Sequence, residues 1–231
     1  FVTTHDGMAS NHHYVLWYQD ERTILVKHEE YPYKFPDVGE PKWIYLSSLA
    51  SNSFPYHEDI STYLKNHPSI KFAFQPGTFQ ISLGTEKLRA LYENCNVFFC
   101  NKEEAGRITA SQSHDIKELF KAVHALGPKT VVITNGIQGA YASEPDGSQW
   151  FVPIYPDPKP PYERTGSGDA FASTVVAALA MDKPLNEALL WGPINAMAVV
   201  QKIGAREGLL TRTELEKYLA EAPAGYKVQR L

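Results

Sequence analysis

Cysteine is scarce in this sequence, whose 231 residues include only Cys95 and Cys100. Two thiols five positions apart cannot supply the disulfide framework of a small secreted domain, so we expect both to be reduced. Reduced thiols favour a cytoplasmic protein. Because 43% of the residues are hydrophobic and 21% are charged, we expect an ordinary folded core in one large domain or two small ones.

The sequence also lacks an excess of positive charge and a long apolar run. Its formal net charge is −4 at pH 7, and an acidic surface attracts neither nucleic acid nor a membrane surface. No apolar run approaches the roughly 20 residues that a membrane-spanning helix needs, and no signal peptide opens the sequence. We therefore expect neither nucleic acid nor a membrane as a partner.

Several motifs of other protein classes are absent. There is no G-x-x-x-x-G-K-[ST] of a P-loop, and the H-R-D and D-F-G of protein kinases are missing. The eight histidines show no H-E-x-x-H spacing, and adjacent His12 and His13 would point to opposite faces of a strand. A dinucleotide-binding oxidoreductase is disfavoured, because "GSGDAF" comes late and lacks the third glycine of G-x-G-x-x-G.

A predicted hairpin precedes a series of alternating strands and helices. Two β-rich runs, Tyr14–Tyr18 and Thr23–His28, are joined by the polar "QDER". We assign residues 1–38 to this hairpin and a linker, and residues 39–231 to a core. In the core, short apolar strands such as "NVFFCN" and "KTVVITNG" predict a mostly parallel sheet covered by helices on both faces. Helices are predicted over residues 57–67, 85–95, 113–127, 168–181, 185–203 and 212–221.

The stretch "RTGSGDAF" (164–171) places a carboxylate in a glycine turn that opens a predicted helix. Such a turn leaves backbone N–H groups unpaired at the positive end of the helix dipole, which suits phosphate. Gly166 and Gly168 would let a ligand approach the backbone closely. The anion would repel Asp169 unless a hydroxyl to be deprotonated or a metal ion lay between them. The alternative is that Asp169 is only a first-turn acid, because short G-x-G matches are common.

Two further polar turns follow buried strands at the same predicted edge of the sheet, where ligands of such sheets bind. They are "FFCNKEEAG" (98–106) and "VVITNGIQGAYA" (131–142). Taken singly, each favours an ordinary turn, whereas three such turns at three strand ends favour a site. The candidate residues are Asn101, Glu104, Thr134, Asn135, Gly136 and Gly139.

"ERTGSGDAF" resembles the D-T-x-G-A-G-D signature of the ribokinase-like, or PfkB, family of carbohydrate and nucleoside kinases. The other family segments follow in order: N-x-x-E at Asn101 and Glu104, the T-x-G-x-x-G-like "TNGIQG", and "INAMAVVQKIGA". The resemblance runs to about residue 220, and "HYVLWYQDERTILVKH" is similar to part of the family's lid. It implies an α/β fold of three layers, with a mostly parallel sheet between helices, plus part of a small β lid over the sugar.

By this resemblance, Asp169 would be the base that takes the proton from the substrate hydroxyl attacking the γ-phosphate of ATP. Gly166, Ser167 and Gly168 would form the anion hole for the developing charge. The resemblance also implies that Asn101 and Glu104 arrange Mg²⁺ and its waters near the phosphates. Asn195 would approach the adenine. The residues that would bind the nucleotide are Thr134, Asn135, Gly136 and Gly139.

The segment departs from the family pattern at three positions. Ser167 replaces an alanine, in a place where backbone groups do the binding. Glu163 stands where many members have the aspartate of a monovalent-cation site, which leaves potassium as an open question. Arg164 replaces a small residue. None of these changes removes the catalytic carboxylate.

The family's substrate-binding acid and double-glycine sugar motif, which lie upstream of the lid, are absent. The first residue is Phe rather than Met, so we expect the natural N-terminus to lie upstream. "FQPGTFQ" (74–80) resembles a family N-P-G loop on the substrate side, and an ordinary Pro-Gly turn explains it equally well.

Two functions stay open at this point. The first is an ATP-dependent kinase that phosphorylates a hydroxyl of a sugar, a nucleoside or a related small alcohol, with the lid as a candidate surface for a homodimer. The second is a non-catalytic nucleotide-binding or assembly domain that keeps the kinase fold without its substrate half. Retention of Asp169 with both glycines favours the enzyme.

Overall fold

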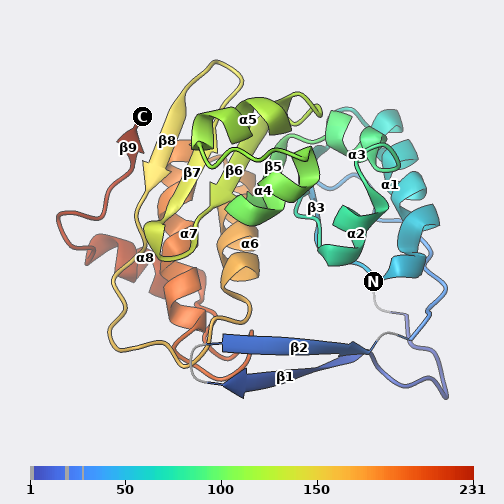
Figure 1. The fold of residues 1–231 in the computed structure, drawn as a ribbon, viewed down its shortest axis with the longest axis horizontal. Helices are drawn as coiled ribbons and strands as arrows, with labels where there is room; N and C mark the ends of the chain where they lie inside the picture. The colour runs from blue at the N-terminus through green and yellow to red at the C-terminus, as the bar shows by residue number, and fades with distance from the viewer. Residues whose placement is uncertain (1–2, 19–20, 28) are drawn as a thin grey trace.

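The computed structural model describes residues 3–18, 21–27 and 29–231, which form a seven-stranded sheet with helices around it and a separate two-stranded hairpin (Figure 1). The strands of the large sheet, in their spatial order, are β3 (Trp43–Leu46), β4 (Lys71–Phe74), β5 (Val97–Asn101), β6 (Thr130–Thr134), β7 (Ala140–Ser143), β8 (Gln149–Val152) and β9 (Gln229–Arg230). The helices are α1 (Phe54–Asn66), α2 (Thr78–Leu83), α3 (Arg89–Glu93), α4 (Lys102–Thr109), α5 (Ile116–His124), α6 (Ser167–Ala180), α7 (Leu185–Val199) and α8 (Arg212–Ala220). None of the helices in the described part of the chain combines the length and apolar character that crossing a membrane requires.

The large sheet is parallel on one side and antiparallel on the other. Strands β3 to β6 pair in parallel, and helices fill the connection from each of these strands to the next. Strands β6 to β9 pair antiparallel, and short turns join β6 to β7 and β7 to β8. The predicted α/β fold is confirmed, and the glycine turns after β6 and β7 explain why the sheet is mixed.

Helices cover both faces of the sheet, as predicted. Along β4, Phe72 and Phe74 are fully buried in one core, whereas Ala73 between them is buried in the other. This alternation follows from the two-residue period of a strand. The first core includes side chains of α1, α3 and α5, and the second is formed mainly with α6 and α7. Both cysteines are buried as free thiols in the first core.

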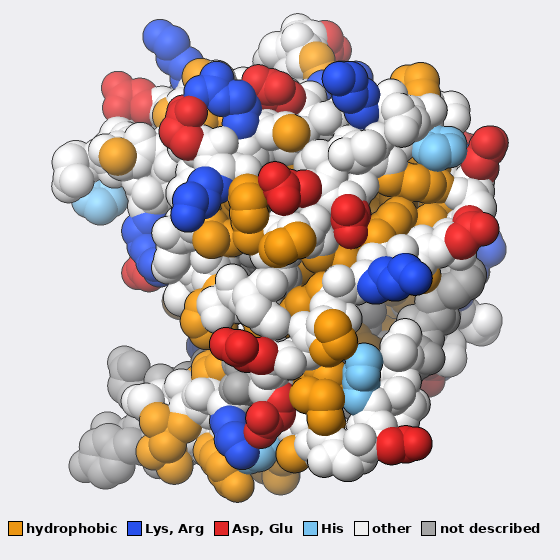
Figure 2. Space-filling model, turned by 90° about the vertical axis from the view of Figure 1, so that its right-hand side faces the viewer, with side chains coloured by type: hydrophobic (Ala, Val, Ile, Leu, Met, Phe, Trp, Pro, Cys, Tyr) orange, Lys and Arg blue, Asp and Glu red, His pale blue; other side chains and the backbone are white. Residues whose placement is uncertain are grey.

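The predicted hairpin forms from β1 (His12–Tyr18) and β2 (Glu21–Lys27), which pair only with each other among the described strands. The first two residues of the connecting "QDER", Gln19 and Asp20, lie outside the described residues, as does His28 at the expected end of the second run. Figure 2 shows hydrophobic side chains gathered at the lower end of the molecule, where the hairpin lies. The hairpin therefore leaves apolar surface uncovered.

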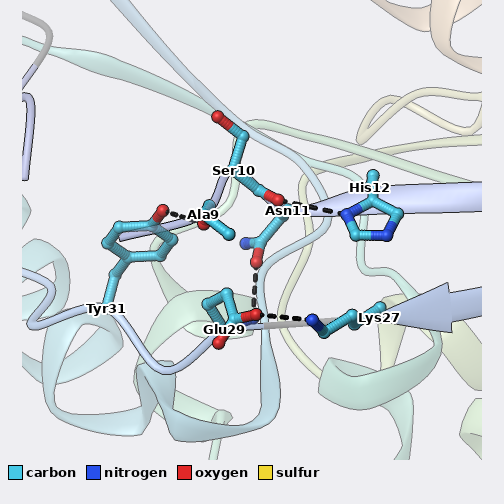
Figure 3. A network of polar contacts seen from close by, with 7 residues as sticks. All are labelled: Ala9, Ser10, Asn11, His12, Lys27, Glu29 and Tyr31. Carbon is cyan, nitrogen blue, oxygen red and sulfur yellow. Dashed lines mark hydrogen bonds and ion pairs between the residues drawn. The ribbon is translucent and has the colours of Figure 1, made fainter. Parts of the chain in front are cut away.

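Polar contacts join the chain segments on either side of the hairpin (Figure 3). The Tyr31 hydroxyl donates to the carbonyl of Ala9 at 2.5 Å, and the Glu29 amide donates to Asn11 Oδ1 at 2.6 Å. The Glu29 carboxylate also pairs with Lys27 at 3.0 Å. These contacts hold together the segment before β1 and the segment after β2, at the end of the hairpin where both strands connect to the rest of the chain.

Short helices account for the main differences from the sequence expectations. α2 and α4 occur in segments that the sequence predicts as turns, and only Arg89–Glu93 of the helix predicted over 85–95 is regular. Each of α2 and α4 begins with a side chain that caps its backbone, Gln80 at Gly77 and Asn101 at Glu104. A helix of six to eight residues is too short to show a clear apolar period, so such caps are its main sequence signal.

Candidate active site

Residues from strand ends and from the start of α6 line a cavity of about 740 Å³. Because β4, β5 and β6 run in parallel, their carboxyl ends meet at this edge of the sheet. Asn101 and Thr134, which end β5 and β6, are direct partners in the sheet register. The predicted site residues that line the cavity are Asn101, Glu104, Thr134, Asn135, Gly136, Gly139, Gly166, Ser167, Gly168 and Asp169.

The glycine turn before α6 places Asp169 in the first turn of that helix. Gly166, the residue before the helix, has φ of 80°, in the left-handed region that favours glycine. A Cβ at Gly166 would lie 2.7 Å from the Cβ of Ala205, so the turn is also closely packed. The first backbone bond of the helix runs from Ala170 N–H to Gly166 at 2.8 Å. The preceding N–H groups of Gly168 and Asp169 thus face the cavity end of the helix, where an anion is favoured.

The Asp169 carboxylate lies in the cavity wall and contacts both solvent and protein. Neighbouring protein atoms desolvate it and raise its pKa above the ordinary value of an aspartate, and the hydrogen bond from Gln75 partly opposes this shift. Gln75 Nε2 donates to Asp169 Oδ1 at 3.1 Å. A carboxylate with a raised pKa accepts a proton more readily than an ordinary aspartate, which is the property a general base needs.

Asn101 and Glu104 form a reciprocal cap at the start of α4. Asn101 Oδ1 accepts the Glu104 N–H, and Glu104 Oε2 accepts the Asn101 N–H, both at 2.8 Å. The cap uses one carboxylate oxygen of Glu104 and fixes the orientation of that side chain. Burial raises the pKa of Glu104, and the hydrogen bond from Asn101 lowers it. The N-x-x-E pattern is therefore both a helix cap and a carboxylate held at the cavity.

The glycines between β6 and β7 allow the backbone to turn at the cavity wall. Gly136 and Gly139 have φ of 54° and 91°, and the turn η2 (Gly136–Gln138) lies between β6 and β7. A Cβ at Gly139 would lie 2.4 Å from the carbonyl oxygen of Val152. Asn135 Nδ2 donates to Gln138 Oε1 at 2.6 Å, which holds the polar side of this turn in place.

Two predicted site residues lie away from the cavity wall. Asn195 is buried, and its amide is engaged on both sides: Nδ2 donates to Thr174 Oγ1 at 2.8 Å and Oδ1 accepts the Leu210 N–H at 3.0 Å. It ties α7 to α6 and to the chain before α8. Its helix and the residue that follows it instead present an apolar wall to the cavity, made of Pro193, Ala196, Met197 and Val200.

Glu163 is the second predicted site residue that does not line the cavity. Its Oε1 accepts the Gly204 N–H at 2.6 Å, which links the loop before α6 to the loop after α7. Its Oε2 is buried and has no hydrogen-bond partner within the described residues. A buried carboxylate oxygen is costly without a partner, so this position is suited to a cation or a water molecule.

Sequence reasoning missed part of the cavity wall. Ser48 follows β3 and lines the cavity, so the rule that ligands bind at strand ends would have found it. Gln75, which also lines the cavity, lies in the "FQPGTFQ" segment that the sequence did point to. Ile154, Tyr155 and Asp157, in the proline-rich loop after β8, carry no such signal. No group of three or more His, Cys, Asp or Glu gathers as metal ligands would in the part of the chain that the structure describes.

Comparison with known proteins identifies the family. The family model described as "pfkB family carbohydrate kinase" matches residues 9–212 of this chain. This match covers most of the chain, and the chain therefore belongs to the pfkB family of carbohydrate kinases. The resemblance drawn from "ERTGSGDAF" and the motifs around it is confirmed.

Relatives of known name are kinases of small molecules. A cytidine kinase of Thermococcus kodakarensis is 35% identical over 118 residues, which are 51% of this chain and 41% of that protein. A ribokinase of Haemophilus influenzae is 27% identical, over 71% of this chain and 52% of its own length. The chain thus spans about half the length of the curated relatives it matches.

Solved structures support the fold. A structure of Arabidopsis thaliana ribokinase with ribose and ATP has a TM-score of 0.73 at 17% identity, over 90% of this chain and 69% of that one. Structures of the same fold hold ATP, ADP or Mg²⁺. The ribokinase-like α/β fold is confirmed, and this chain is a member of a family of sugar and nucleoside kinases.

The close contact at Gly139 generates a stability prediction. We expect Gly139→Ala to lower the free energy of unfolding by about 3 kcal/mol or more, because it combines a left-handed φ with a clash against backbone. Gly147→Ala is the matched control, since Gly147 has φ of 85° and open space around its Cβ. We expect Gly147→Ala to lower the free energy of unfolding by about 1 kcal/mol. Urea denaturation measures both, and equal losses would show that the contact with Val152 costs nothing.

Proposed function

We propose that this chain provides the phosphate-transfer site of an ATP-dependent kinase, which phosphorylates a hydroxyl of a sugar, a nucleoside or a related small alcohol. The observation that carries the proposal is the position of Asp169 in the first turn of α6, where a base and an anion-binding helix end face the same cavity. A substrate hydroxyl placed between them would contact the carboxylate on one side and the phosphate on the other.

Each part of this site has a defined task. Asp169 accepts the proton of the attacking hydroxyl, and its raised pKa keeps it a better proton acceptor than an ordinary aspartate. The N–H groups at the start of α6 stabilise the charge that develops on the transferred phosphate. Phosphoryl transfer depends mainly on such positioning and charge stabilisation.

The turns after β5 and β6 hold the nucleotide and its metal in this proposal. Thr134, Asn135, Gly136 and Gly139 surround the phosphates and ribose, while the apolar wall of α7 packs against the base. Glu104 has one carboxylate oxygen outside its capping bond, which fits a water ligand of Mg²⁺. Mg²⁺, when bound, supplies positive charge to the phosphates of ATP. Asn195 supports the apolar wall from behind rather than meeting the base.

Replacing the base tests the reaction directly. We expect Asp169→Asn to lower kcat about 10²- to 10⁴-fold while ATP affinity changes by less than about twofold, because the amide keeps the shape and cannot accept the proton. ADP release across a panel of sugars and nucleosides, in the complete protein that the gene encodes, measures turnover, and calorimetry with Mg²⁺ measures ATP binding. Asp59→Asn, at an exposed position of α1, is the control.

The outcomes separate the two functions. ATP binding with no turnover of any acceptor would favour the non-catalytic nucleotide-binding domain. An Asp169→Asn protein as active as Asp59→Asn would contradict the role of Asp169 as base.

Potassium is the proposed partner of Glu163. The buried Oε2, which has no partner in the described part of the chain, lies in the loop that leads into the anion-binding turn, and Oε1 already holds the loop after α7. A monovalent cation there would neutralise the carboxylate and fix both loops. The cation would therefore act on nucleotide binding indirectly, through the start of α6.

Cation exchange tests this assignment without turnover. We expect K⁺ to strengthen ATP binding several-fold relative to tetramethylammonium, and Glu163→Gln to abolish that difference while keeping the bond to Gly204. Calorimetry in the two salts at equal ionic strength measures the effect. Equal ATP affinity of the unaltered protein in both salts would rule out the cation site and leave a water molecule as the partner of Oε2.

Residues 1–38 are proposed to form part of the lid. Ile24 of β2 lines the cavity, which supports a hairpin that covers the site with one face. Tyr14 and Leu25 are direct cross-strand partners, and with Leu16 they point to the other face, where all three are exposed. An exposed apolar face on a two-stranded sheet favours self-association, and we propose that a second copy covers it.

The mass of the particle in solution tests the dimer. We expect Leu25→Asp to convert a dimer into a monomer in sedimentation equilibrium, because it places a charge in the middle of the apolar face. Leu209→Asp, at another exposed leucine, should leave the dimer intact. A monomeric unaltered protein would contradict the proposal.

A further inference from the structure

Gln75 bridges a tyrosine and the proposed catalytic base. The Tyr45 hydroxyl donates to Gln75 Oε1 at 2.5 Å, and Gln75 Nε2 donates to Asp169 Oδ1 at 3.1 Å. The three residues come from β3, from the loop after β4 and from α6, and they are 30 and 94 positions apart along the chain. Only the folded protein brings them together.

The backbone fixes the starting point of this bridge. Gln75 follows the last residue of β4, and its N–H donates to the carbonyl of Leu46 on β3 at 2.9 Å, which continues the parallel ladder by one step. Tyr45 lies on the neighbouring strand, one residue before the last. Both ends of the Tyr45–Gln75 bond are therefore anchored in the sheet, and only the Gln75 side chain extends toward α6.

The bridge also fixes which way the Gln75 amide points. A side-chain amide offers an oxygen that accepts and an NH₂ group that donates. The flipped amide would set its oxygen against the Asp169 carboxylate oxygen, whereas the tyrosine hydroxyl could bond either end of the amide. Burial, followed by the charge of Asp169, raises the pKa of Tyr45, so this hydroxyl keeps its proton. The ionised Asp169 carboxylate, which only accepts, therefore selects the orientation of the amide, and the Tyr45 hydroxyl donates to the amide oxygen in that orientation.

The consequence concerns the two oxygens of the carboxylate. Gln75 donates to Oδ1, so Oδ2 is the carboxylate oxygen that the amide does not occupy. We propose that Gln75, held by Tyr45, is a positioning residue that keeps the Asp169 carboxylate with Oδ2 toward the acceptor hydroxyl. This inference rests on the proposed kinase function, because the acceptor hydroxyl is part of that function.

A spectroscopic test measures the bridge without turnover. The side-chain NH₂ signals of Gln75 in ¹⁵N–¹H spectra are assigned by their loss in Gln75→Leu. We expect both Tyr45→Phe and Asp169→Asn to shift these signals, since each removes or changes one partner of the amide. Tyr226→Phe is the matched control, because its hydroxyl donates to the carbonyl of Leu190 at 2.5 Å, away from the cavity wall. Gln75 signals that respond to neither Tyr45→Phe nor Asp169→Asn would overturn the bridge.

Turnover separates positioning from support of the fold. In the complete protein we expect Tyr45→Phe to lower kcat about tenfold and Gln75→Leu about a hundredfold, because a base displaced by about 1 Å loses rate on this scale. KM for ATP and for the acceptor should change less than about twofold, and Tyr226→Phe should change neither constant. A loss confined to KM, or a kcat of Tyr45→Phe equal to that of the control, would overturn the positioning role.

Failure of the kinase proposal remains distinguishable. An active Asp169→Asn protein would overturn the base assignment and the positioning role together, even where the spectra establish the bridge. Loss of kcat in Tyr45→Phe, with an inactive Asp169→Asn and shifted Gln75 signals, supports both.

Discussion

The parallel pairing of β3 to β6 is the constraint on which the rest of the site depends. Parallel strands end at one edge, so the residues that follow them must meet there whatever their distance along the chain. Gln75, Asn101 and Thr134 reach the cavity for this reason. The antiparallel strands beyond β6 add the glycine turn after Thr134 and extend the sheet. The cavity is therefore lined by the ends of the parallel strands and by this turn.

Glycine turns and side-chain caps then set the direction in which each chain segment leaves the sheet edge. Gly166 and Gly139 are packed against Ala205 and Val152 so closely that a methyl group would meet other atoms. These contacts fix the start of α6 and the turn after β6 as rigid walls. Asn101 and Glu104 do the same at α4 through their reciprocal cap. Rigid walls are what preorganised charge stabilisation needs.

A buried polar network supports the loop that carries Gln75. Gln80, fully buried, accepts the Gly77 N–H at 2.7 Å and donates to the Ser47 carbonyl at 3.1 Å. Its Nε2 also lies 3.0 Å from His57 Nε2, which must accept, so the proton of His57 is on Nδ1 and faces the Ser53 carbonyl at 2.7 Å. Burial lowers the pKa of His57, in keeping with a neutral ring. The network links α1, the chain after β3, and α2, next to the loop of the candidate positioning residue.

The sequence by itself determined the α/β class, the hairpin and the family, because apolar strand patterns and the ordered motifs around Asp169 are local features of the chain. It also indicated which strand ends to inspect. Only the tertiary structure decided that the side-chain amide of Asn195 is hydrogen-bonded to other residues of the protein, and that Glu163 lies outside the cavity wall. It alone joined Tyr45 to Gln75 and Gln75 to Asp169. The reason is physical: a motif specifies residue types along the chain, whereas hydrogen-bond partners far apart in sequence are chosen by the packing of strands and helices.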